Sequence, residues 1–438
     1  MEVVTLFERL RHRIGRKRSE HYLDPETFDP PRDERVAVEA LLCGAQAGRP
    51  LERWVEETGE ESRASLRLVD SPYVSFLRSV RARPAGLDDD AFLRDTDYYR
   101  MAKRCAEHAG KWFGAREDAG ILERVRTFGR MLPELSGDAG PELRSLGGEG
   151  LQGRSTRGEP LQVFAVRDSR CRELQDGHHR AALAVMAGHD AVDARVLGSK
   201  WSYLQRLVLQ GVQTRGRKEM YQPLPAPEMD GDWKLVRRCS DRFAMMRRFL
   251  EERGIAGDGR RSLDLASSYG WFVSAFRDLG FSAHGVERDE VAVRVGRVGY
   301  RLAPDSVRVM SLERFLRGNE ERFDVVLFLS ILHHFVIGRE SGAATELIRL
   351  VDRACSGVLF FDTGEEHEGW MAGKLPGWNA DFVERWLREN TTFDEIVRLG
   401  TDEDVVTFPG NYGRTLFACI RVRNGSDSSR RDGRHRPS

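Results

Sequence analysis

The chain has 438 residues, which is longer than one ordinary core accommodates, so two or three domains are expected. Its hydrophobic content of 40% and charged content of 32% are typical of a soluble globular protein, and it contains no apolar run suited to a transmembrane helix or a signal peptide, so a cytoplasmic location is expected. Lys and Arg number 69, as do Asp and Glu, and the resulting formal net charge of +0 disfavours nucleic acid as the main partner.

Residues 1–148 are predicted to be mostly helical. The stretch FERLRHRIGRKR has apolar residues at helical spacing among arginines. It is either a solvated helix with one packed stripe, which we favour, or a helix lying on an anionic membrane surface. A second helix is predicted over 88–113, where acidic residues precede a run with aromatic side chains that can pack inward. The segment 136–160 is rich in Gly and polar residues, as is typical of a linker or a long loop.

Residues 149–222 are predicted to form a small α+β module. Apolar patterning predicts strands over 161–168, 171–175 and 190–197, with a turn and a helix ending at Gly188 between the last two. A helix around 201–210 follows. Three prolines in YQPLPAPEMDGDW then break the pattern, and we place the main domain boundary there.

The turn DGHHR in this module is a candidate phosphate-binding site. An Asp-Gly turn exposes the first N–H groups of the following helix, and these groups and the helix dipole favour an anion. Arg180 adds a forked donor, and either histidine adds a donor or a base. A purely structural turn is the alternative. The residues assigned to this site are Asp176, Gly177, His178, His179 and Arg180.

This segment resembles the ParB/sulfiredoxin-like nucleotide-binding fold over about residues 151–197. Members carry a box of the D-G-H-H-R type at a helix start, followed by an Ala-rich helix and a strand, as here. The resemblance implies a nucleotide ligand, ATP or CTP. The box lacks the cysteine of sulfiredoxin, and no helix-turn-helix follows, which disfavours the repair and DNA-partitioning activities. Some relatives are small-molecule kinases, so phosphoryl transfer and a regulatory nucleotide pocket both stay open.

Residues 236–423 alternate between strands and amphipathic helices. Apolar runs predict strands over 261–266, 282–287, 306–311, 323–329 and 357–362, and all of them except 306–311 are followed by a helical pattern. This alternation predicts a parallel sheet covered on both faces. The segments 393–400 and 413–422 are expected to close the domain as a β-hairpin pair. The tail over 424–438 lacks apolar content and is expected to be disordered.

The first turn of this domain, LDLASSYGWF, is a candidate cofactor site. Asp264 ends a strand, and small residues follow before Gly270 opens a helix. In a doubly wound sheet this turn faces the ligand crevice, and small residues let the backbone approach a ligand closely. Glu287 ends the next strand, where a carboxylate can bind the two hydroxyls of a ribose.

The arrangement resembles the Rossmann-like S-adenosylmethionine-dependent methyltransferases over roughly residues 241–422. The family pattern D-x-G-x-G-x-G falls on this turn with two of its three glycines replaced. A nicotinamide-dependent dehydrogenase is the rival, but its G-x-G-x-x-G is not supplied by ASSYGWF. The resemblance implies that the turn binds the methionine end of the cofactor and that Glu287 binds its ribose. It further implies that the adenine binds after the third strand, and that the end of the fourth strand faces the methyl group that is transferred. The cofactor residues so assigned are Asp264, Ala266, Ser268, Gly270, Glu287, Ser311, Leu312 and Leu329.

His333 and His334 follow the fourth strand and are the candidate catalytic residues. An imidazole with a pKa near neutrality is suited to removing a hydroxyl proton while the oxygen attacks the methyl group. Similar small-molecule O-methyltransferases carry a histidine at this place. The alternative is that one histidine caps the strand by a hydrogen bond to the backbone. If the base lies elsewhere, the next candidates are Glu365, Glu366 and His367.

We therefore predict an α/β enzyme with a C-terminal doubly wound, seven-stranded Rossmann-like methyltransferase sheet, a small ParB/sulfiredoxin-like module and a helical N-terminal region. The predicted reaction is methyl transfer from S-adenosylmethionine to a hydroxyl or amine of a small molecule or glycan. The alternatives are a bifunctional small-molecule kinase–methyltransferase and a non-catalytic nucleotide- or DNA-binding regulator. No metal site is predicted, because the six cysteines lack C-x-x-C spacing and the acidic loop after the fifth strand is more simply explained by solvated charges or substrate contacts.

Overall fold

The computed structural model describes residues 30–44, 51–132, 160–212, 214, 216–337, 342–369, 371, 373–403 and 413–422. The N-terminal amphipathic helix, the predicted linker apart from Pro160, and the tail over 424–438 lie outside these residues. No helix within the described ranges is long and apolar enough to cross a membrane. The chain forms two compact units, the first comprising 1–218, 224–233 and 297–301, and the second comprising 219–223, 234–296 and 302–438.

The first unit is built on a five-stranded mixed sheet with the strand order β1-β5-β3-β4-β2. β1 runs antiparallel to β5, with Ala37 opposite Ala191, and β2 runs parallel to β4. The two edge strands therefore come from the segment before the helices, and they complete a sheet whose other strands belong to the predicted module. The strands are β1 Arg32–Ala37, β2 Leu41–Cys43, β3 Leu161–Val166, β4 Arg172–Asp176 and β5 Ala191–Lys200.

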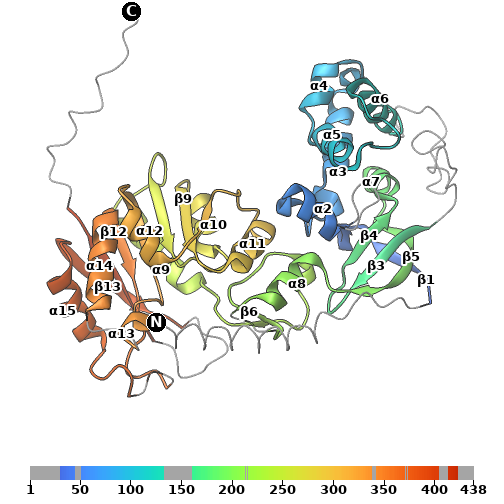
Figure 1. Ribbon diagram of the computed structural model, residues 1–438. Helices are drawn as coiled ribbons and strands as arrows, with labels where there is room; N and C mark the ends of the chain where they lie inside the picture. The colour runs from blue at the N-terminus through green and yellow to red at the C-terminus, as the bar shows by residue number, and fades with distance from the viewer. Residues whose placement is uncertain are drawn as a thin grey trace, which may run out of the picture. The chain divides into compact units, whose positions relative to one another are not determined.

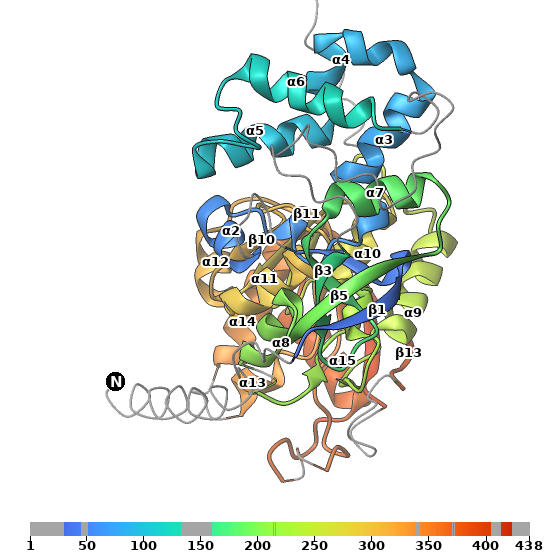
Figure 2. The same ribbon diagram turned by 90° about the vertical axis from the view of Figure 1, so that its right-hand side faces the viewer.

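A layer of helices covers one face of this sheet. α7 packs against α3, with α5 and α6 further from the sheet (Figures 1 and 2). Phe76, Tyr98 and Phe128 fill the helical layer, and they share one hydrophobic core with Leu174 of β4 and Leu183 of α7. The helices from 51–132 and the predicted module thus form a single compact unit, although the sequence analysis treated them as separate segments.

The helix predicted over 88–113 is divided into two helices, α4 and α5. Thr96 ends the first helix, and its side chain caps the second by accepting a hydrogen bond from the backbone N–H of Tyr99 (3.2 Å). A threonine in this position satisfies an N–H group that has no partner within the helix. The helices of the unit are α2 Leu51–Thr58, α3 Pro72–Ala82, α4 Asp90–Asp95, α5 Asp97–Ala109, α6 Asp118–Gly129, α7 His178–Met186 and α8 Tyr203–Gln210.

The second unit contains a seven-stranded sheet with the order β10-β9-β8-β11-β12-β14-β13. The first five strands in this order are parallel, and β14 runs antiparallel to both of its neighbours. The predicted fold class, including the closing hairpin, is confirmed. The strands are β8 Arg261–Leu265, β9 Ser282–Glu287, β10 Val307–Val309, β11 Phe323–Phe328, β12 Cys355–Phe361, β13 Glu395–Thr401 and β14 Thr415–Ile420, with a separate ribbon of β6 Glu219–Met220 and β7 Lys234–Leu235.

The sheet lies between two layers of helices (Figure 1), and buried side chains of β11 are divided between two hydrophobic clusters. Leu327 of β11 packs in the cluster that contains α9 and α10, whereas Phe328 packs with α12, α14 and α15. Since both faces of such a sheet are covered, ligands of doubly wound proteins bind outside the carboxyl ends of the strands. The helices are α9 Ser240–Glu252, α10 Trp271–Asp278, α11 Glu290–Gly299, α12 Leu312–Gly318, α13 His333–Val336, α14 Ala343–Ala354 and α15 Ala380–Asn390.

Candidate functional site

The turn between β8 and α10 has the backbone conformation of a glycine-rich loop. Ala266, Ser268 and Gly270 have φ angles of +61°, +53° and +82°. These are the three positions at which the resemblance expects glycine. A left-handed conformation at a residue with a Cβ costs about 1–2 kcal/mol, and such strain is concentrated at functional sites. At Ala266 and Ser268 the backbone thus adopts a conformation that glycine favours.

Two buried polar atoms of this turn have no hydrogen-bond partner among the described residues. They are Oδ2 of Asp264 and Oγ of Ser267. These two residues are only 5% and 1% exposed. Burial, and then the nearby charge of Glu287, raise the pKa of Asp264 to about 7. Buried polar groups are rarely left unpaired, so these two atoms mark the turn as a candidate ligand site. Ser267 was not among the residues assigned from the sequence.

Glu287 ties the end of β9 to the same turn. Its Oε2 accepts the backbone N–H of Ser268 (2.8 Å), and its Oε1 accepts those of Arg288 (2.7 Å) and Asp289 (2.9 Å). Burial raises the pKa of this carboxyl, while the three backbone N–H groups oppose the shift. A carboxylate has about four acceptor positions, so one remains after these three bonds for a ligand hydroxyl.

Gln222 is a further residue of this site that sequence reasoning missed. Its side-chain carbonyl accepts the backbone N–H of Trp271, the first residue of α10, and its amide donates to the backbone carbonyl of Ser267 (3.2 and 3.4 Å). The side chain is buried. It therefore fixes both ends of the turn, and only its position beside the proline-rich segment set it apart in the sequence.

The residues assigned to the adenine have packing roles in the structure. Ser311 caps α12 by accepting the backbone N–H of Arg314 (3.3 Å), and Leu312 lies in the core with α14. The backbone N–H of Met310 donates to the carbonyl of Glu287 (2.9 Å), which brings the end of β10 beside the ribose candidate. Leu329 is buried in the opposite cluster, with α9 and α10.

The two histidines after β11 have different environments. His333 is 2% exposed, and its Nδ1 accepts the backbone N–H of Gly364 (3.0 Å). Burial, followed by the charges of neighbouring residues, lowers its pKa to about 2. His334 is exposed, and its ring lies 4.2 Å from that of His333 between centroids. Partial burial, and then Arg414 and Arg288, lower the pKa of His334. Both rings are therefore neutral at physiological pH.

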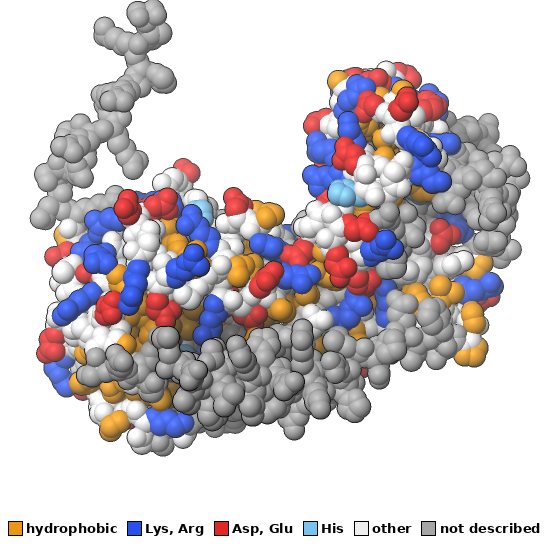
Figure 3. Space-filling view, in the orientation of Figure 1, with side chains coloured by type: hydrophobic (Ala, Val, Ile, Leu, Met, Phe, Trp, Pro, Cys, Tyr) orange, Lys and Arg blue, Asp and Glu red, His pale blue; other side chains and the backbone are white. Residues whose placement is uncertain are grey.

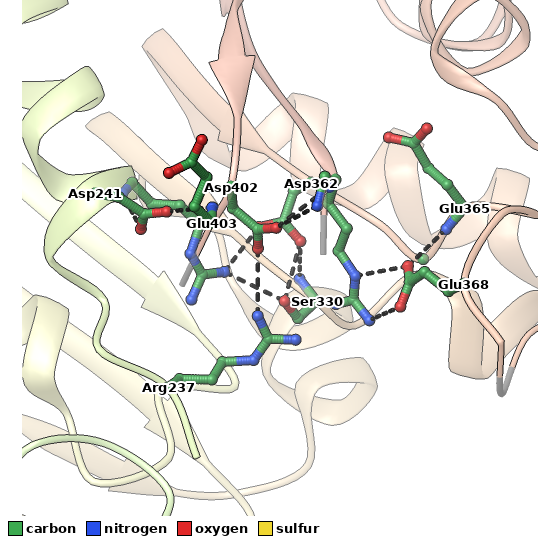
Figure 4. A network of polar contacts seen from close by, with 12 residues as sticks. Arg237, Asp241, Ser330, Asp362, Glu365, Glu368, Asp402 and Glu403 are labelled. Atoms are coloured by element: carbon green, nitrogen blue, oxygen red, sulfur yellow. Dashed lines mark hydrogen bonds and ion pairs between the residues drawn. The ribbon is translucent and has the colours of Figure 1, made fainter. Parts of the chain in front are cut away.

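A network of buried ion pairs lies at the carboxyl ends of β11 and β12 (Figure 4). Asp362 accepts from Nη1 of Arg242 (2.8 Å) and from the backbone N–H and Oγ of Ser330 (2.7 and 3.0 Å). Asp402 pairs with Arg237 (3.3 Å). Patterns within short windows could not reveal these pairs, because Arg242 and Asp362 are 120 positions apart.

The acidic loop after β12 is held by protein partners. Arg414 binds Glu368 with both Nε and Nη2 (2.8 Å each), and these side chains are 2% and 0% exposed. Glu365 accepts the backbone N–H of Thr415 (2.7 Å), and Glu366 accepts that of Gly377 (2.7 Å). Among the residues that the structure describes, no three His, Cys, Asp or Glu side chains gather as a metal site.

In the first unit, the last three residues of the DGHHR box are the first residues of α7. Gly177, which precedes the helix, has a φ of +95°. A Cβ on this glycine would lie 2.4 Å from Leu161, so glycine is required there. His179 points into a cage of aromatic rings and bonds the hydroxyl of Tyr98 through Nε2 (2.6 Å). Burial lowers its pKa to about 3. The rings around it are those of Tyr73, Tyr98, Trp112, Phe113 and Phe128.

Two other polar residues of the box, His178 and Arg180, are buried, whereas the side chain of Asp176 is 51% exposed. His178 stacks on Tyr73 (5.5 Å between centroids), and its Nε2 has no partner among the described residues. Burial lowers its pKa to about 4. Arg180 is 8% exposed and pairs with Asp176 (3.4 Å). His179 thus joins α7 to the helical layer. His178 is the histidine of the pair that has a ring nitrogen without a partner among the described residues.

Comparison with protein-family models and with curated proteins finds no match for this chain. Among solved structures it is similar to the bifunctional kinase–methyltransferase WbdD, at 21% identity over 46% of this chain and 39% of WbdD, with a TM-score of 0.38. It is similar to magnesium protoporphyrin IX methyltransferase from Synechocystis PCC 6803 with bound SAM, at 17% identity over 42% of this chain and 79% of that one, with a TM-score of 0.31. A SAM-dependent methyltransferase from Archaeoglobus fulgidus matches at 11% identity over 42% of this chain and 95% of that one, with a TM-score of 0.30. The chain thus spans about two fifths of WbdD. The strand order defines the second unit as a doubly wound α/β domain, and residues with left-handed backbone form the turn after its first strand.

Proposed function

We propose that the second unit is an S-adenosylmethionine-dependent methyltransferase that acts on a hydroxyl or amine of a small molecule or glycan. The observation that carries the proposal is the turn after β8, where left-handed backbone at Ala266 and Ser268 coincides with unpartnered buried atoms on Asp264 and Ser267. Strain and unpaired polar atoms both destabilise a fold, and they are retained together where a ligand uses them.

The residues of the turn fit the chemistry of this cofactor. Asp264 supplies a carboxyl oxygen for the amino group of the methionine end, and Ser267 supplies a hydroxyl beside it. Glu287 keeps one acceptor position for a ribose hydroxyl after its three backbone bonds. Gln222 fixes the position of the turn relative to the start of α10 through its two hydrogen bonds. When bound, the cofactor supplies a methyl group on an activated sulfonium.

His334 is the better placed of the two candidate bases. Nδ1 of His333 accepts the N–H of Gly364, so the neutral ring carries its proton on Nε2 and has no lone pair left to take another. His334 is exposed, and the lowered pKa of its ring keeps it unprotonated. We assign His334 as the group that removes the acceptor proton, and His333 as a positioning residue that holds the loop after β12. Positioning of the two substrates supplies most of the acceleration.

Calorimetry with S-adenosylhomocysteine tests the proposal. The wild-type chain should bind it, and Glu287→Ala should weaken binding by about 1–3 kcal/mol, because a buried hydroxyl loses its acceptor. Glu290→Ala, which removes an exposed carboxylate at the start of α11, is the matched control and should bind as the wild type does. Absence of binding by the wild type would refute the function, and binding of NAD in its place would favour the dehydrogenase alternative.

A second candidate function concerns the ParB/sulfiredoxin-like module, which we propose binds a phosphate-bearing nucleotide at the start of α7. The observation that favours it is the unpartnered Nε2 of buried His178 beside the left-handed Gly177. The pairing of Arg180 with Asp176 places a guanidinium at the same helix start. Catalysis of phosphoryl transfer and regulation by the nucleotide are both compatible with these contacts.

Thermal unfolding with ATP or CTP tests this second proposal. Either nucleotide should raise the melting temperature of the wild-type chain, and Arg180→Ala should remove that shift while the shift caused by S-adenosylhomocysteine persists. If neither nucleotide shifts the wild type, the box is a structural turn. Consumption of ATP that survives Glu287→Ala would instead identify a bifunctional kinase–methyltransferase.

A further inference from the structure

The loop after β12 and the segment before β14 present unused hydrogen-bond donors beside the two histidines. β12 and β14 pair antiparallel with Phe361 opposite Phe417, so Thr363 and Arg414 lie at the same end of these strands. Both side chains are 2% exposed. Oγ1 of Thr363 and Nη1 of Arg414 have no hydrogen-bond partner among the described residues.

Two carboxylates of this region, Glu368 and Asp362, are paired with arginines. Glu368 occupies Nε and Nη2 of Arg414, and Nη1 has no hydrogen-bond partner within the described ranges. Asp362 is paired with Arg242 (2.8 Å). In Figure 4, Glu368 lies to one side of Asp362 and Ser330, in the same polar network. A guanidinium clamped on one edge by a carboxylate is held rigid, and its remaining N–H groups suit an oxygen anion.

The donors are connected to the proposed base. Gly364, which follows Thr363, donates its backbone N–H to His333, and the ring of His333 lies against that of His334. The positive charges of Arg414 and Arg288 both lower the pKa of His334. Two cationic side chains thus lie near the proposed base, and basic and acidic side chains are intermixed across the face seen in Figure 3.

We propose that the methyl acceptor carries an oxyanion, a carboxylate or a phosphate, which binds Nη1 of Arg414 and Oγ1 of Thr363 next to the nucleophile held at His334. This inference rests on the proposed methyltransferase function and narrows its substrate class. Arg288, which is exposed, adds long-range attraction for the anion. The oxyanion is a recognition group here, and no bond to it is made or broken.

The test uses the full chain saturated with S-adenosylhomocysteine, and inorganic phosphate and acetate as probes. Each ion's affinity is measured from the rise of the melting temperature with its concentration. Thr363→Val removes one unpartnered hydroxyl and preserves the side-chain shape, so it should leave the fold intact and weaken ion binding roughly three- to tenfold. Arg288→Gln should weaken binding less, and its effect should vanish at high salt. Thr345→Val on α14 is the control, with unchanged affinity expected.

Turnover distinguishes the two anions. Release of S-adenosylhomocysteine is compared for hydroxybenzoates against their methyl esters, and for sugar phosphates against the free sugars. Faster reaction of the charged member in either pair supports the proposal and identifies the anion. Absence of binding by both ions, equal binding by Thr363→Val, or equal turnover of neutral acceptors would each overturn it. Since S-adenosylhomocysteine binding is measured separately, its absence would refute the methyltransferase function itself, whereas its presence without ion binding would refute only the oxyanion site.

Discussion

Replacing Asp264 by Asn should remove a pH dependence from the stability of the second unit. Burial, and then the charge of Glu287, raise the pKa of Asp264 from 3.8 to about 7 in the folded chain. A carboxyl whose pKa is raised by folding stabilises the folded state below its unfolded pKa, and this contribution is lost as the pH rises through the folded pKa. The difference between 3.8 and about 7 corresponds to roughly 4 kcal/mol in the free energy of unfolding.

Asn has nearly the shape of Asp and carries no charge at any pH. Asp264→Asn should therefore be more stable than the wild type at about pH 8, by up to roughly 4 kcal/mol, and nearly equal to it at about pH 4. Hydrogen exchange of peptides from β8 and β11 in the full chain, corrected for the intrinsic exchange rate, measures this difference for the second unit alone. Asp258→Asn, in an exposed loop of the same unit, is the control and should follow the wild type.

Cofactor binding gives an independent readout of the same group. A cation bound beside a carboxyl lowers its pKa, so S-adenosylmethionine should release protons from the wild type near neutral pH and none from Asp264→Asn. Calorimetry in two buffers with different ionisation enthalpies counts these protons. Parallel stability profiles for the wild type and Asp264→Asn between about pH 5 and pH 8 would refute the reasoning, because they would mean that Asp264 is ionised and compensated in the folded chain.

Four further changes test the turn and the base. Ala266→Gly relieves about 1–2 kcal/mol of left-handed strain and costs about 0.5–1 kcal/mol through the greater backbone entropy of the unfolded chain, so urea unfolding should show stabilisation of up to about 1.5 kcal/mol; clear destabilisation would contradict the strain. Gln222→Ala should accelerate hydrogen exchange at the start of α10 while leaving β13 and β14 unchanged, and unchanged exchange throughout would remove its role at the turn. His334→Ala should lower kcat about 10²–10⁴-fold at unchanged cofactor affinity, with partial recovery at high pH, whereas His333→Ala should mainly destabilise the loop after β12. Wild-type rates in His334→Ala would move the base elsewhere.

The strands of the second unit could be predicted because their signals are local. FDVVLF and GVLFF are nearly continuous apolar runs, as expected for strands buried on both faces. The turn after β8 was found through its spacing, although its glycines are replaced. β1 was missed because RDERVA is charged and lies at a sheet edge, where one face and one edge stay exposed.

Other features could not be predicted because they depend on residues distant in the sequence. The chemistry of DGHHR suggested that either histidine supplies a donor or a base to a ligand. The environment of His179 is set by rings from Tyr73 to Phe128, and no pattern within the box shows that it enters the helical layer. The buried partners of Asp362 and Glu368 likewise come from α9 and the start of β14.

The edge strands β1 and β2 also determine when the first unit can fold during synthesis. They leave the ribosome before the helices, yet their partners in β5 and β4 are made only after residue 170, so the growing chain carries a helical layer with no sheet to cover. Pairing across such separations is slow, and the apolar side of α3 and α5 is meanwhile open to chaperones or to neighbouring nascent chains. The charges of RDERVA protect the waiting edge from strand-to-strand association. A fragment that starts after β2 would lack both edges, so the predicted module is expected to aggregate when expressed by itself.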